Sequence, residues 1–417
     1  MSAQHHTKPL PDHGAILVIN CGSSSVKFSL IKPDSGKSIL SGIAERLYSE
    51  QAEIKIKHEP IDGDKTVDVH KLATPYNHIK SLEVLVDKLK LLSLVQDITA
   101  IGHRIVHGGD LYAEPTLIDE QVKKTIDSLA KLAPLHNPAN LMGINACQNA
   151  FGDLPQVAVF DTAFHQSMPQ KAFMYGVPNA LYKDHGIRRY GFHGTSHYFV
   201  AKSAAKYLAK PLNECHFITA HLGNGCSVAA IKNGKSVDTS MGMTPLEGVM
   251  MGTRSGDIDA GVIFHLVNQL GYTIDDVERT LIKESGLLGV SQYSNDCRSL
   301  EEAMNNPQHP HCKQAALAMN IFCYKIAKYI ASYSACLSQL DGLIFTGGIG
   351  ENSPWVRHNI VKQLSLLNFA LCEEKNEKVF AGASGNIAAQ NSRACWVINT
   401  NEEWVIAEQT QQLLDNS

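Results

Sequence analysis

Two apolar runs near the start of the chain flank a turn rich in glycine and serine. Residues 15–20 read AILVIN, residues 21–25 read CGSSS and residues 26–31 read VKFSLI. Strand-type runs on both sides of a Gly/Ser turn predict a β-hairpin. The same order recurs in FITAHLGNGCSVAAI at 217–231. This recurrence predicts two related halves that each open with a hairpin. Its period is far too long for the repeats of a solenoid.

Helical patterns lie between these strands. Val122, Ile126, Leu129 and Ala133 share one face of a helix, which predicts a helix over 119–133 that ends at Pro134. The long, weakly charged segment 314–340 contains two lysines and several polar residues, so it predicts a buried amphipathic helix rather than a bilayer span. We expect Asp341-Gly342 to end that helix.

The next segment alternates again between the two patterns. The short strand LIFT at 343–346 leads into a predicted turn, GGIGENSP at 347–354, and then into another helix. Ser353 suits the N-cap of that helix and Pro354 its first position. Strands that alternate with helices in this way predict an α/β protein.

Composition adds limits to this picture. The chain has 417 residues, a formal net charge of −4, 44% hydrophobic and 19% charged residues. The length predicts more than one domain, and no low-complexity linker separates them. The balanced charge gives no basic field, so we expect no nucleic-acid partner. We also expect no membrane span, and the polar first fourteen residues contain no apolar segment typical of a signal peptide.

Ten cysteines are spread along the chain without any Cys-x-x-Cys pair. This spacing does not support a zinc ribbon or a thioredoxin-type site, and the cysteine content is too low for a disulfide scaffold. We expect reduced thiols in a cytoplasmic protein. Cys21 and Cys226 lie inside glycine-rich loops, where oxidation could affect activity, although small buried cysteines are the more common case.

Three glycine-rich loops could hold phosphates: Cys21–Ser25, Leu222–Cys226 and Gly347–Glu351. Glycine lets the backbone approach an anion, and successive N–H groups then surround its oxygens. The first loop reads GSSSVK, but a Walker A motif needs GxxxxGK[ST] followed by a helix, so we reject that interpretation. Each loop alone is also compatible with a tight turn. Together they predict a nucleotide held between two domains, as in actin-like and sugar-kinase-like ATPases.

Short polar clusters between these loops contain the candidate reactive groups. Asp161 follows the apolar strand VAVF, the usual place for a functional side chain in an open α/β sheet. Arg104 and Arg254 lie among glycines, where a guanidinium could bind a carboxylate or phosphate through two hydrogen bonds. The alternative for all three is a buried ion pair.

Two histidine pairs, His103/His107 and His193/His197, have the i, i+4 spacing of metal ligands on a helix. Glycines beside both pairs make a regular helix unexpected there. We therefore expect hydrogen-bonded structural histidines rather than a metal site.

Ten motifs in this chain closely resemble those of the acetate kinase family, in the family's order and from about residue 16 to about 407. They are VINCGSSSVKF, GHRIVHGG, PLHNP, VFDTAFH, YGFHGTSH, HLGNGCS, MTPLEG, GTRSGD, FTGGIGENS and TNEE. The resemblance implies an α/β protein with a duplicated ribonuclease-H-like (actin-like ATPase) fold. It also implies reversible transfer of the γ-phosphoryl of ATP to acetate, giving acetyl phosphate and ADP.

The resemblance assigns a role to each matching residue. Asn20 and Glu402 match the magnesium positions (Mn²⁺ could substitute), and Asp161, Arg104, Arg254 and His193 match the catalytic positions. Nucleotide contacts match Lys27, His221, Leu222, Gly223, Asn224, Gly225, Asp296, Cys297, Arg298, Gly347, Gly348, Ile349, Gly350 and Glu351. The substrate pocket matches Arg104, Val106, Leu135, His136, Phe192 and Pro245, for which ordinary core packing is the alternative.

Acetate has a carboxylic pKa near that of Glu, ~4.3, so the acceptor is already ionised at neutral pH. A base therefore gains little, and cations and positioning should supply most of the catalysis. We hypothesise that Asp161 orients an arginine or the water shell of Mg²⁺ rather than removing a proton.

The resemblance further implies two domains, 1–161 rejoined by about 403–417, and 162–402, with the active site in the cleft between them and closure around ATP. It implies a homodimer formed through the second domain. Two alternatives stay open: a propionate or butyrate kinase, and an actin-like ATPase that is not a kinase.

Overall fold

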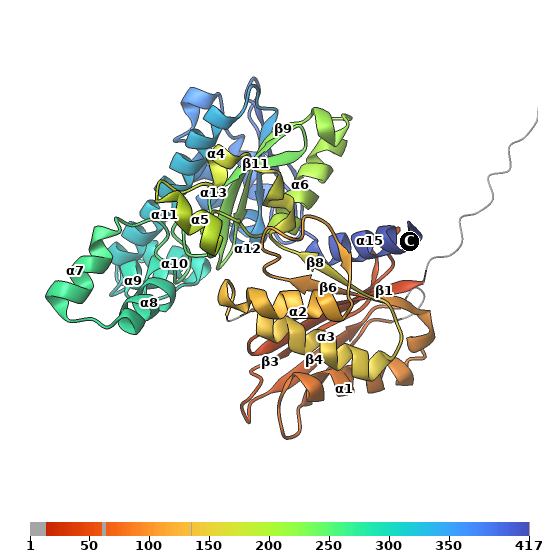
Figure 1. Ribbon diagram of the computed structural model, residues 1–417. Helices are drawn as coiled ribbons and strands as arrows, with labels where there is room; N and C mark the ends of the chain where they lie inside the picture. The colour runs from red at the N-terminus through yellow and green to blue at the C-terminus, as the bar shows by residue number, and fades with distance from the viewer. Residues whose placement is uncertain (1–13, 61–63, 135, 417) are drawn as a thin grey trace, which may run out of the picture. The chain divides into compact units, whose positions relative to one another are not determined.

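The computed structural model describes residues 14–60, 64–134 and 136–416. It divides into two compact units (Figure 1). The first comprises the residues up to Gly108, Glu114–Phe160 and the segment from Glu403 onward; the second comprises Gly109–Ala113 and Asp161–Glu402. The predicted boundaries differ from these units at Asp161 and at Gly109–Ala113, which both cluster with the second unit.

The first unit contains a mixed sheet with the strand order β5-β4-β3-β2-β1-β6-β8-β7. Its strands are β1 (Ala15–Gly22), β2 (Ser25–Ile31), β3 (Ser38–Glu45), β4 (Glu53–His58), β5 (Thr66–Lys71), β6 (Ile98–Ile105), β7 (Thr116–Leu117) and β8 (Gln156–Phe160). Its helices are α1 (His78–Leu91), α2 (Glu120–Ser128), α3 (Asn137–Phe151) and α15 (Glu402–Asp415), with 3-10 turns at Val95–Asp97 and Leu129–Lys131.

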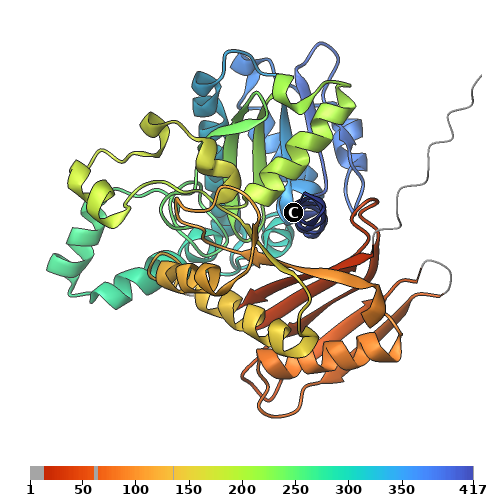
Figure 2. The ribbon, with the colours of Figure 1, turned by 45° about the vertical axis from the view of Figure 1, so that its right-hand side comes forward.

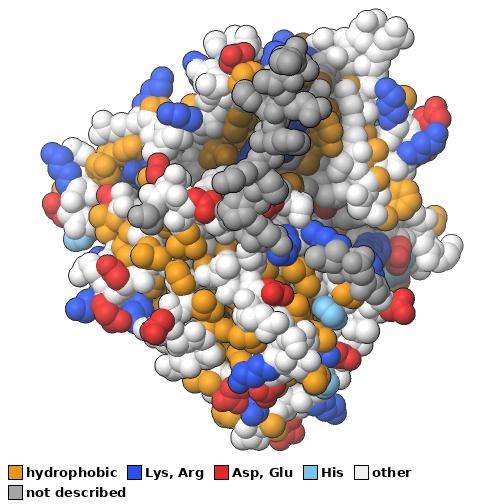
Figure 3. All heavy atoms as spheres, turned by 90° about the vertical axis from the view of Figure 1, so that its right-hand side faces the viewer, with side chains coloured by type: hydrophobic (Ala, Val, Ile, Leu, Met, Phe, Trp, Pro, Cys, Tyr) orange, Lys and Arg blue, Asp and Glu red, His pale blue; other side chains and the backbone are white. Residues whose placement is uncertain are grey.

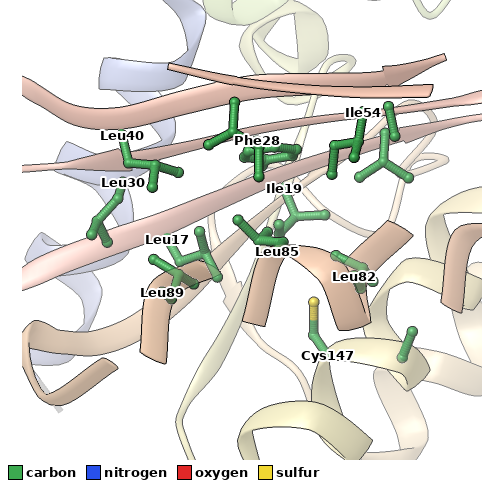
Figure 4. Packing of buried hydrophobic residues seen from close by; sticks show 14 of the residues in the cluster. Leu17, Ile19, Phe28, Leu30, Leu40, Ile54, Leu82, Leu85, Leu89 and Cys147 are labelled. Carbon is green, nitrogen blue, oxygen red and sulfur yellow. The ribbon is translucent and has the colours of Figure 1, made fainter. Parts of the chain in front are cut away.

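Strand β1 is buried on both faces, and its alternation decides what each face meets. Leu17 and Ile19 pack with α1 and with Cys147 of α3 in one cluster (Figure 4). Ile16 and Val18 point to the opposite face and pack with Ile406 of α15. The apolar run AILVI therefore becomes the centre of a three-layer α/β/α unit, since successive side chains of a strand point to opposite faces.

The second unit has a sheet with the strand order β11-β10-β9-β12-β14-β13. The strands are β9 (His216–Leu222), β10 (Cys226–Lys232), β11 (Lys235–Thr239), β12 (Gly342–Thr346), β13 (Gly385–Asn386) and β14 (Ala394–Val397). Its helices are α4 (Gln170–Phe173), α5 (Asn179–His185), α6 (Gly194–Tyr207), α7 (Gly261–Leu270), α8 (Ile274–Lys283), α9 (Gly286–Ser291), α10 (Cys297–Met304), α11 (Cys312–Tyr333), α12 (Gly347–Asn352), α13 (Pro354–Val361) and α14 (Glu373–Lys378). Shorter 3-10 turns occupy Ala163–Ser167, Leu212–Glu214, Ser334–Cys336 and Ser365–Leu367.

The two sheets repeat one topology. The segment β3-β2-β1-β6-β8 of the first unit matches β11-β10-β9-β12-β14 of the second, strand for strand along the order. In each, an antiparallel hairpin is followed by two parallel strands. Both predicted hairpins are therefore confirmed, and the duplication predicted from their repetition is present in the fold.

The predicted helices form, with three differences. The segment 119–133 contains α2, which Asp119 caps, and then changes to a 3-10 turn; α11 ends at Tyr333 rather than near 340. Ser353 caps α13 as predicted, with its hydroxyl accepting the N–H of Val356 at 3.1 Å. The predicted turn at 347–354 is wrong, because 347–352 forms α12.

Within the second unit, α7, α8, α9 and α10 lie together to one side of the sheet (Figures 1 and 2). In the part of the chain that the structure describes, no helix is both long and apolar enough to cross a membrane. Both basic and acidic side chains are scattered over the face shown in Figure 3, beside a broad area of hydrophobic side chains.

Candidate active site

A pocket of about 470 Å³ in the second unit brings together three of the predicted nucleotide segments. Gly223 and Asn224 come from the turn between β9 and β10, Asp296–Arg298 from the start of α10, and Gly348 and Ile349 from α12. Four further lining residues were not among the predicted contacts: Asn295, Glu301, Asn352 and Ser353. All four stand within a few positions of a predicted residue, and Asn352 and Ser353 belong to the FTGGIGENS motif itself, which was the available signal.

Gly347 and Glu351 support the pocket without lining it. Gly347 has φ +76°, and a side chain there would lie 2.7 Å from the carbonyl oxygen of Leu222, so only glycine lets the two loops meet. The Glu351 carboxylate accepts the N–H groups of Gly347 at 2.9 Å and Thr400 at 3.0 Å. These hydrogen bonds connect the loop to the TNEE segment, and the role of Glu351 as a nucleotide contact stays a prediction.

Beside this pocket, Arg254 and His193 converge on Gly225. A Cβ atom built on Gly225 would lie 3.5 Å from Arg254 Nη1 and 3.5 Å from His193 Nε2. The imidazole of His193 stacks on that of His221, with ring centroids 4.2 Å apart and planes inclined by 25°. The turn between β9 and β10 thus lines the pocket at Gly223 and contacts the side chains of Arg254 and His193 at Gly225. We call these two side chains the cationic edge.

The guanidinium of Arg254 is oriented by its own loop. Its Nη1 donates to the carbonyl of Pro245 at 3.1 Å, and burial lowers the pKa of Arg254 from its ordinary value. That loop is fastened through Glu247, which accepts Arg189 Nη2 at 2.5 Å and the hydroxyl of Tyr175. Arg189 also donates to the three backbone carbonyls at 239–241, so it connects that segment to Glu247.

Asp161 lies directly after β8, as predicted, and is 1% exposed. Its backbone carbonyl accepts the N–H of Gly194 at 2.9 Å, and its carboxylate accepts the hydroxyl of Thr195 at 3.3 Å. Gly194 and Thr195 begin α6. The carboxylate therefore contacts the first turn of α6.

The expectation that glycines prevent a helix around His193 and His197 is wrong, because α6 starts at Gly194 and includes His197. Glycine is tolerated at a helix start, where backbone N–H groups have no partner within the helix. His193 precedes α6 with φ +58°, a left-handed conformation that is costly for a residue with a side chain. Among the described residues there is no group of three or more His, Cys, Asp or Glu side chains arranged for a metal ion.

Six predicted residues belong to the first unit. Asn20 lies on β1, Lys27 on β2 and Arg104 on β6. Lys27 is exposed and Arg104 is partly buried. Val106 is 8% exposed and its N–H donates to Asn140 at 3.1 Å, whereas His136 precedes α3. Leu135 lies outside the described residues.

The other two predicted pocket residues are in the second unit, where Phe192 is 3% exposed and Pro245 is partly buried. Glu402, the second predicted magnesium position, is the first residue of α15. All ten cysteines are free in the structure. Burial raises the pKa of Cys21 to about 12 and that of Cys226 to about 12, which keeps both as unreactive thiols at neutral pH.

The duplicated α/β topology, with a glycine-rich pocket in one copy, places the chain in the class of proteins with the actin-like ATPase fold. Within this class, the chain belongs to the acetokinase family, whose model matches residues 15–408. As a member it is a kinase with a carboxyl group as acceptor.

Comparison with individual proteins agrees with this assignment. The acetate kinase of Shewanella oneidensis is 52% identical over 401 residues, which cover 96% of this chain and 98% of that protein. A propionate kinase from Francisella tularensis superposes with a TM-score of 0.89 at 43% identity, covering 96% of this chain and 99% of the other. The acetate kinase of Porphyromonas gingivalis superposes with a TM-score of 0.88 at 38% identity, covering 96% and 100%.

Proposed function

We propose that this protein transfers the γ-phosphoryl group of ATP to acetate, reversibly and by direct in-line transfer. One observation supports this most strongly: the turn between β9 and β10 lines the 470 Å³ pocket at Gly223 and lies against Arg254 and His193 at Gly225. A nucleotide in the pocket would have backbone N–H groups and a guanidinium at its phosphate end, which is how phosphoryl-transfer enzymes stabilise developing charge. The acetate kinase relative at 52% identity supports the same reaction.

The chemistry then depends on bringing two anions together. The carboxylate of acetate is ionised at neutral pH, so the acceptor needs no deprotonation. We propose that Arg254, His193 and Arg104 neutralise the transferring phosphoryl group and the substrate carboxylate. We further propose that Lys27, His221–Gly225, Asp296–Arg298 and Gly347–Gly350 hold the nucleotide, with Glu351 supporting them through the hydrogen bonds described above.

Asp161 is proposed as a positioning group. Its carboxylate accepts the Thr195 hydroxyl at the start of α6, immediately next to His193 in the chain. Asp161→Asn keeps the shape and removes the charge, so we expect a large fall in kcat that high pH does not restore. A rate loss that disappeared at high pH, or with a more acidic acceptor, would instead make Asp161 a base.

Magnesium is proposed as the cofactor, with Asn20 and Glu402 as the residues that would hold it. An amide and a carboxylate oxygen are the hard donors that Mg²⁺ prefers, and magnesium in kinases is usually bound by one or two protein groups plus substrate phosphates. When bound, the ion would neutralise phosphate charge, and Mn²⁺ is expected to substitute for it.

We propose a homodimer in the cytoplasm, with α7 in the interface. None of the residues of α7 is buried in the single chain, and Phe264 is 65% exposed, with Val262 41% and Leu270 58% exposed. A helix that leaves its large apolar side chains exposed in the single chain is a candidate for a protein interface. Sedimentation should give a mass of twice 45.6 kDa, and a mass of 45.6 kDa would contradict the dimer.

The deciding experiment traps acyl phosphate with hydroxylamine in the presence of ATP and acetate, propionate or butyrate. We expect the highest kcat/KM with acetate and a lower but measurable value with propionate. The extra methylene of propionate changes the free energy of discrimination by only ~1–3 kcal/mol, so propionate should still react. The 43% identity to a propionate kinase makes propionate the main competing acceptor. A preference for propionate or butyrate would replace the proposed substrate, and ATP binding without acyl phosphate from any acid would overturn the kinase assignment.

A further inference from the structure

A continuous chain of buried hydrogen bonds runs behind His193 into the second sheet. His193 Nδ1 lies 2.9 Å from Ser227 Oγ, Ser227 Oγ lies 2.7 Å from His197 Nε2, and His197 Nδ1 lies 2.6 Å from Thr219 Oγ1. Ser227, His197 and Thr219 are all 0% exposed. We name these four residues the histidine–serine chain. None of the motifs assigned a role to Ser227, His197 or Thr219.

Each hydroxyl in this chain carries a single proton, which limits the arrangements. Ser227 contacts one nitrogen of each imidazole, so it can donate to only one of them and accepts from the other. Burial, reinforced by the nearby His165 and His221, lowers the pKa of His197 well below its ordinary value, so His197 is neutral and has one N–H. Two proton arrangements of opposite direction remain.

In one arrangement, Thr219 donates to His197 Nδ1, His197 Nε2–H donates to Ser227, and Ser227 donates to His193 Nδ1. A neutral His193 then has its only proton on Nε2. In the reverse arrangement, His193 Nδ1–H donates to Ser227, and a neutral His193 has a bare Nε2. Only the first arrangement lets Nε2 donate a hydrogen bond while the His193 ring stays neutral. In the reverse arrangement Nε2 could donate only if His193 gained a second proton, which would place a second positive charge next to Arg254.

The surroundings of His193 favour the first arrangement. Its Nε2 atom and Arg254 Nη1 both lie within 3.5 Å of the Cβ position at Gly225, so they face the same small space. An anion placed there is held best when both groups donate to it. We infer that Ser227, supported by His197 and Thr219, is a positioning residue that holds His193 in the Nε2–H tautomer needed to bind the transferring phosphoryl group. This inference rests on the proposed function for its purpose, but not for the tautomer itself.

The tautomer can be measured on the full-length protein without any substrate. With ¹⁵N-labelled histidine, long-range ¹H–¹⁵N spectra distinguish a protonated ring nitrogen from a bare one, and His193→Gln identifies the His193 signals. We expect a protonated Nε2 and a bare Nδ1 in the neutral ring. A protonated Nδ1 with a bare Nε2 would overturn the inference, whether or not the protein proves to be an acetate kinase.

Two variants then connect the tautomer to catalysis. Ser227→Ala removes the donor to Nδ1, so we expect a mixture of His193 tautomers and a fall in kcat of about tenfold, the size of one neutral hydrogen bond. KM for ATP and for acetate should change less than twofold. Thr219→Val keeps the side-chain shape at the far end of the chain and should give a smaller shift in the same direction. If both variants keep the wild-type His193 spectrum, Ser227 does not set the tautomer.

Ser236→Ala is the matched control. Ser236 is also 0% exposed, and its Oγ lies 2.7 Å from Nδ1 of another buried histidine, His165, in the same unit. Ser236→Ala should therefore lower thermal stability about as much as Ser227→Ala, while kcat stays within twofold and the His193 spectrum does not change. An equal loss of kcat in both variants would show that general loosening, and not the tautomer, explains the effect.

Discussion

The two hairpins of this chain occupy the same place in two copies of one sheet, yet they carry different chemistry. In the first, Asn20 pairs with Lys27, two pairs before the turn-closing pair Gly22–Ser25; in the second, His221 pairs with Ser227, one pair before the turn-closing pair Leu222–Cys226. Lys27 is exposed, whereas Ser227 is 0% exposed and belongs to the histidine–serine chain. A duplicated backbone thus supplies an exposed cation in one unit and a buried polar network in the other.

The difference arises from what covers each hairpin. Cys21 of the first hairpin packs against Gly143 of α3, among apolar residues. The second hairpin meets α6 instead, whose first turn supplies Ser196 and His197 as hydrogen-bond partners for His221 and Ser227. Buried polar groups need such partners, so the polar residues of β9 and β10 are tolerated only with this helix beside them.

The largest expected effect tests the cationic edge of the second hairpin. Arg254→Gln should lower kcat by about 10²–10³-fold, because it removes a preorganised donor to developing charge. Arg279→Gln, an exposed arginine on α8 that pairs with Asp276 and Glu284, is the matched control and should keep kcat within twofold. Steady-state kinetics with acetate decides this, and similar losses in both variants would exclude a specific role for Arg254.

The exposed cation of the first hairpin should act mainly on nucleotide binding. Lys27→Met should raise KM for ATP by about ten- to a hundredfold, the range expected for a lost hydrogen bond to a charged group. Lys55→Met removes an equally exposed lysine from β4 and should leave KM unchanged. If Lys27→Met lowered kcat and left KM for ATP unaltered, the prediction that Lys27 acts mainly on nucleotide binding would be wrong.

Acid should weaken both units through buried histidines. Burial lowers the pKa of His103 in the first unit to about 4 and that of His165 in the second to about 4. Each stays neutral in the fold but gains a proton in the unfolded chain below its ordinary value of ~6.5, so the stabilisation is complete above pH 6.5 and is lost as the pH falls toward 4. Each contributes a slope of about 1.4 kcal/mol per pH unit.

Urea unfolding at pH 7, 6 and 5 measures these slopes. His103→Gln and His165→Gln should each remove about the same part of the pH dependence, whereas the exposed His70→Gln should remove little. Unequal reductions would show that the two units respond differently to acid.

The smallest effect concerns the acyl pocket. Val106→Ala should raise the kcat/KM ratio of propionate to acetate by about fivefold, somewhat less than the full contribution of one methylene. Val157→Ala shortens another buried valine of the first unit, which lies on β8 and packs in the cluster that contains Ile406 of α15. It should leave the ratio unchanged. An unaltered ratio in Val106→Ala would remove Val106 from the pocket.

The amino-acid sequence alone determined the elements whose signals are local. The apolar runs around CGSSS and GNG determine both hairpins, since strand propensity and turn chemistry act over a few residues. Ser353 and Pro354 determine the start of α13 for the same reason. The order of ten motifs determined the family, because each motif retains the residue types that its chemistry requires.

Only the tertiary structure decided which of these residues meet. Glu351 belongs to a nucleotide motif, yet its carboxylate is used by the backbone of Gly347 and Thr400, which is 49 residues away. Ser227 and His197 belong to different motifs and became neighbours only when α6 packed on β9 and β10. Hydrogen bonds between distant segments depend on packing in three dimensions, so no local pattern of residues could have specified them.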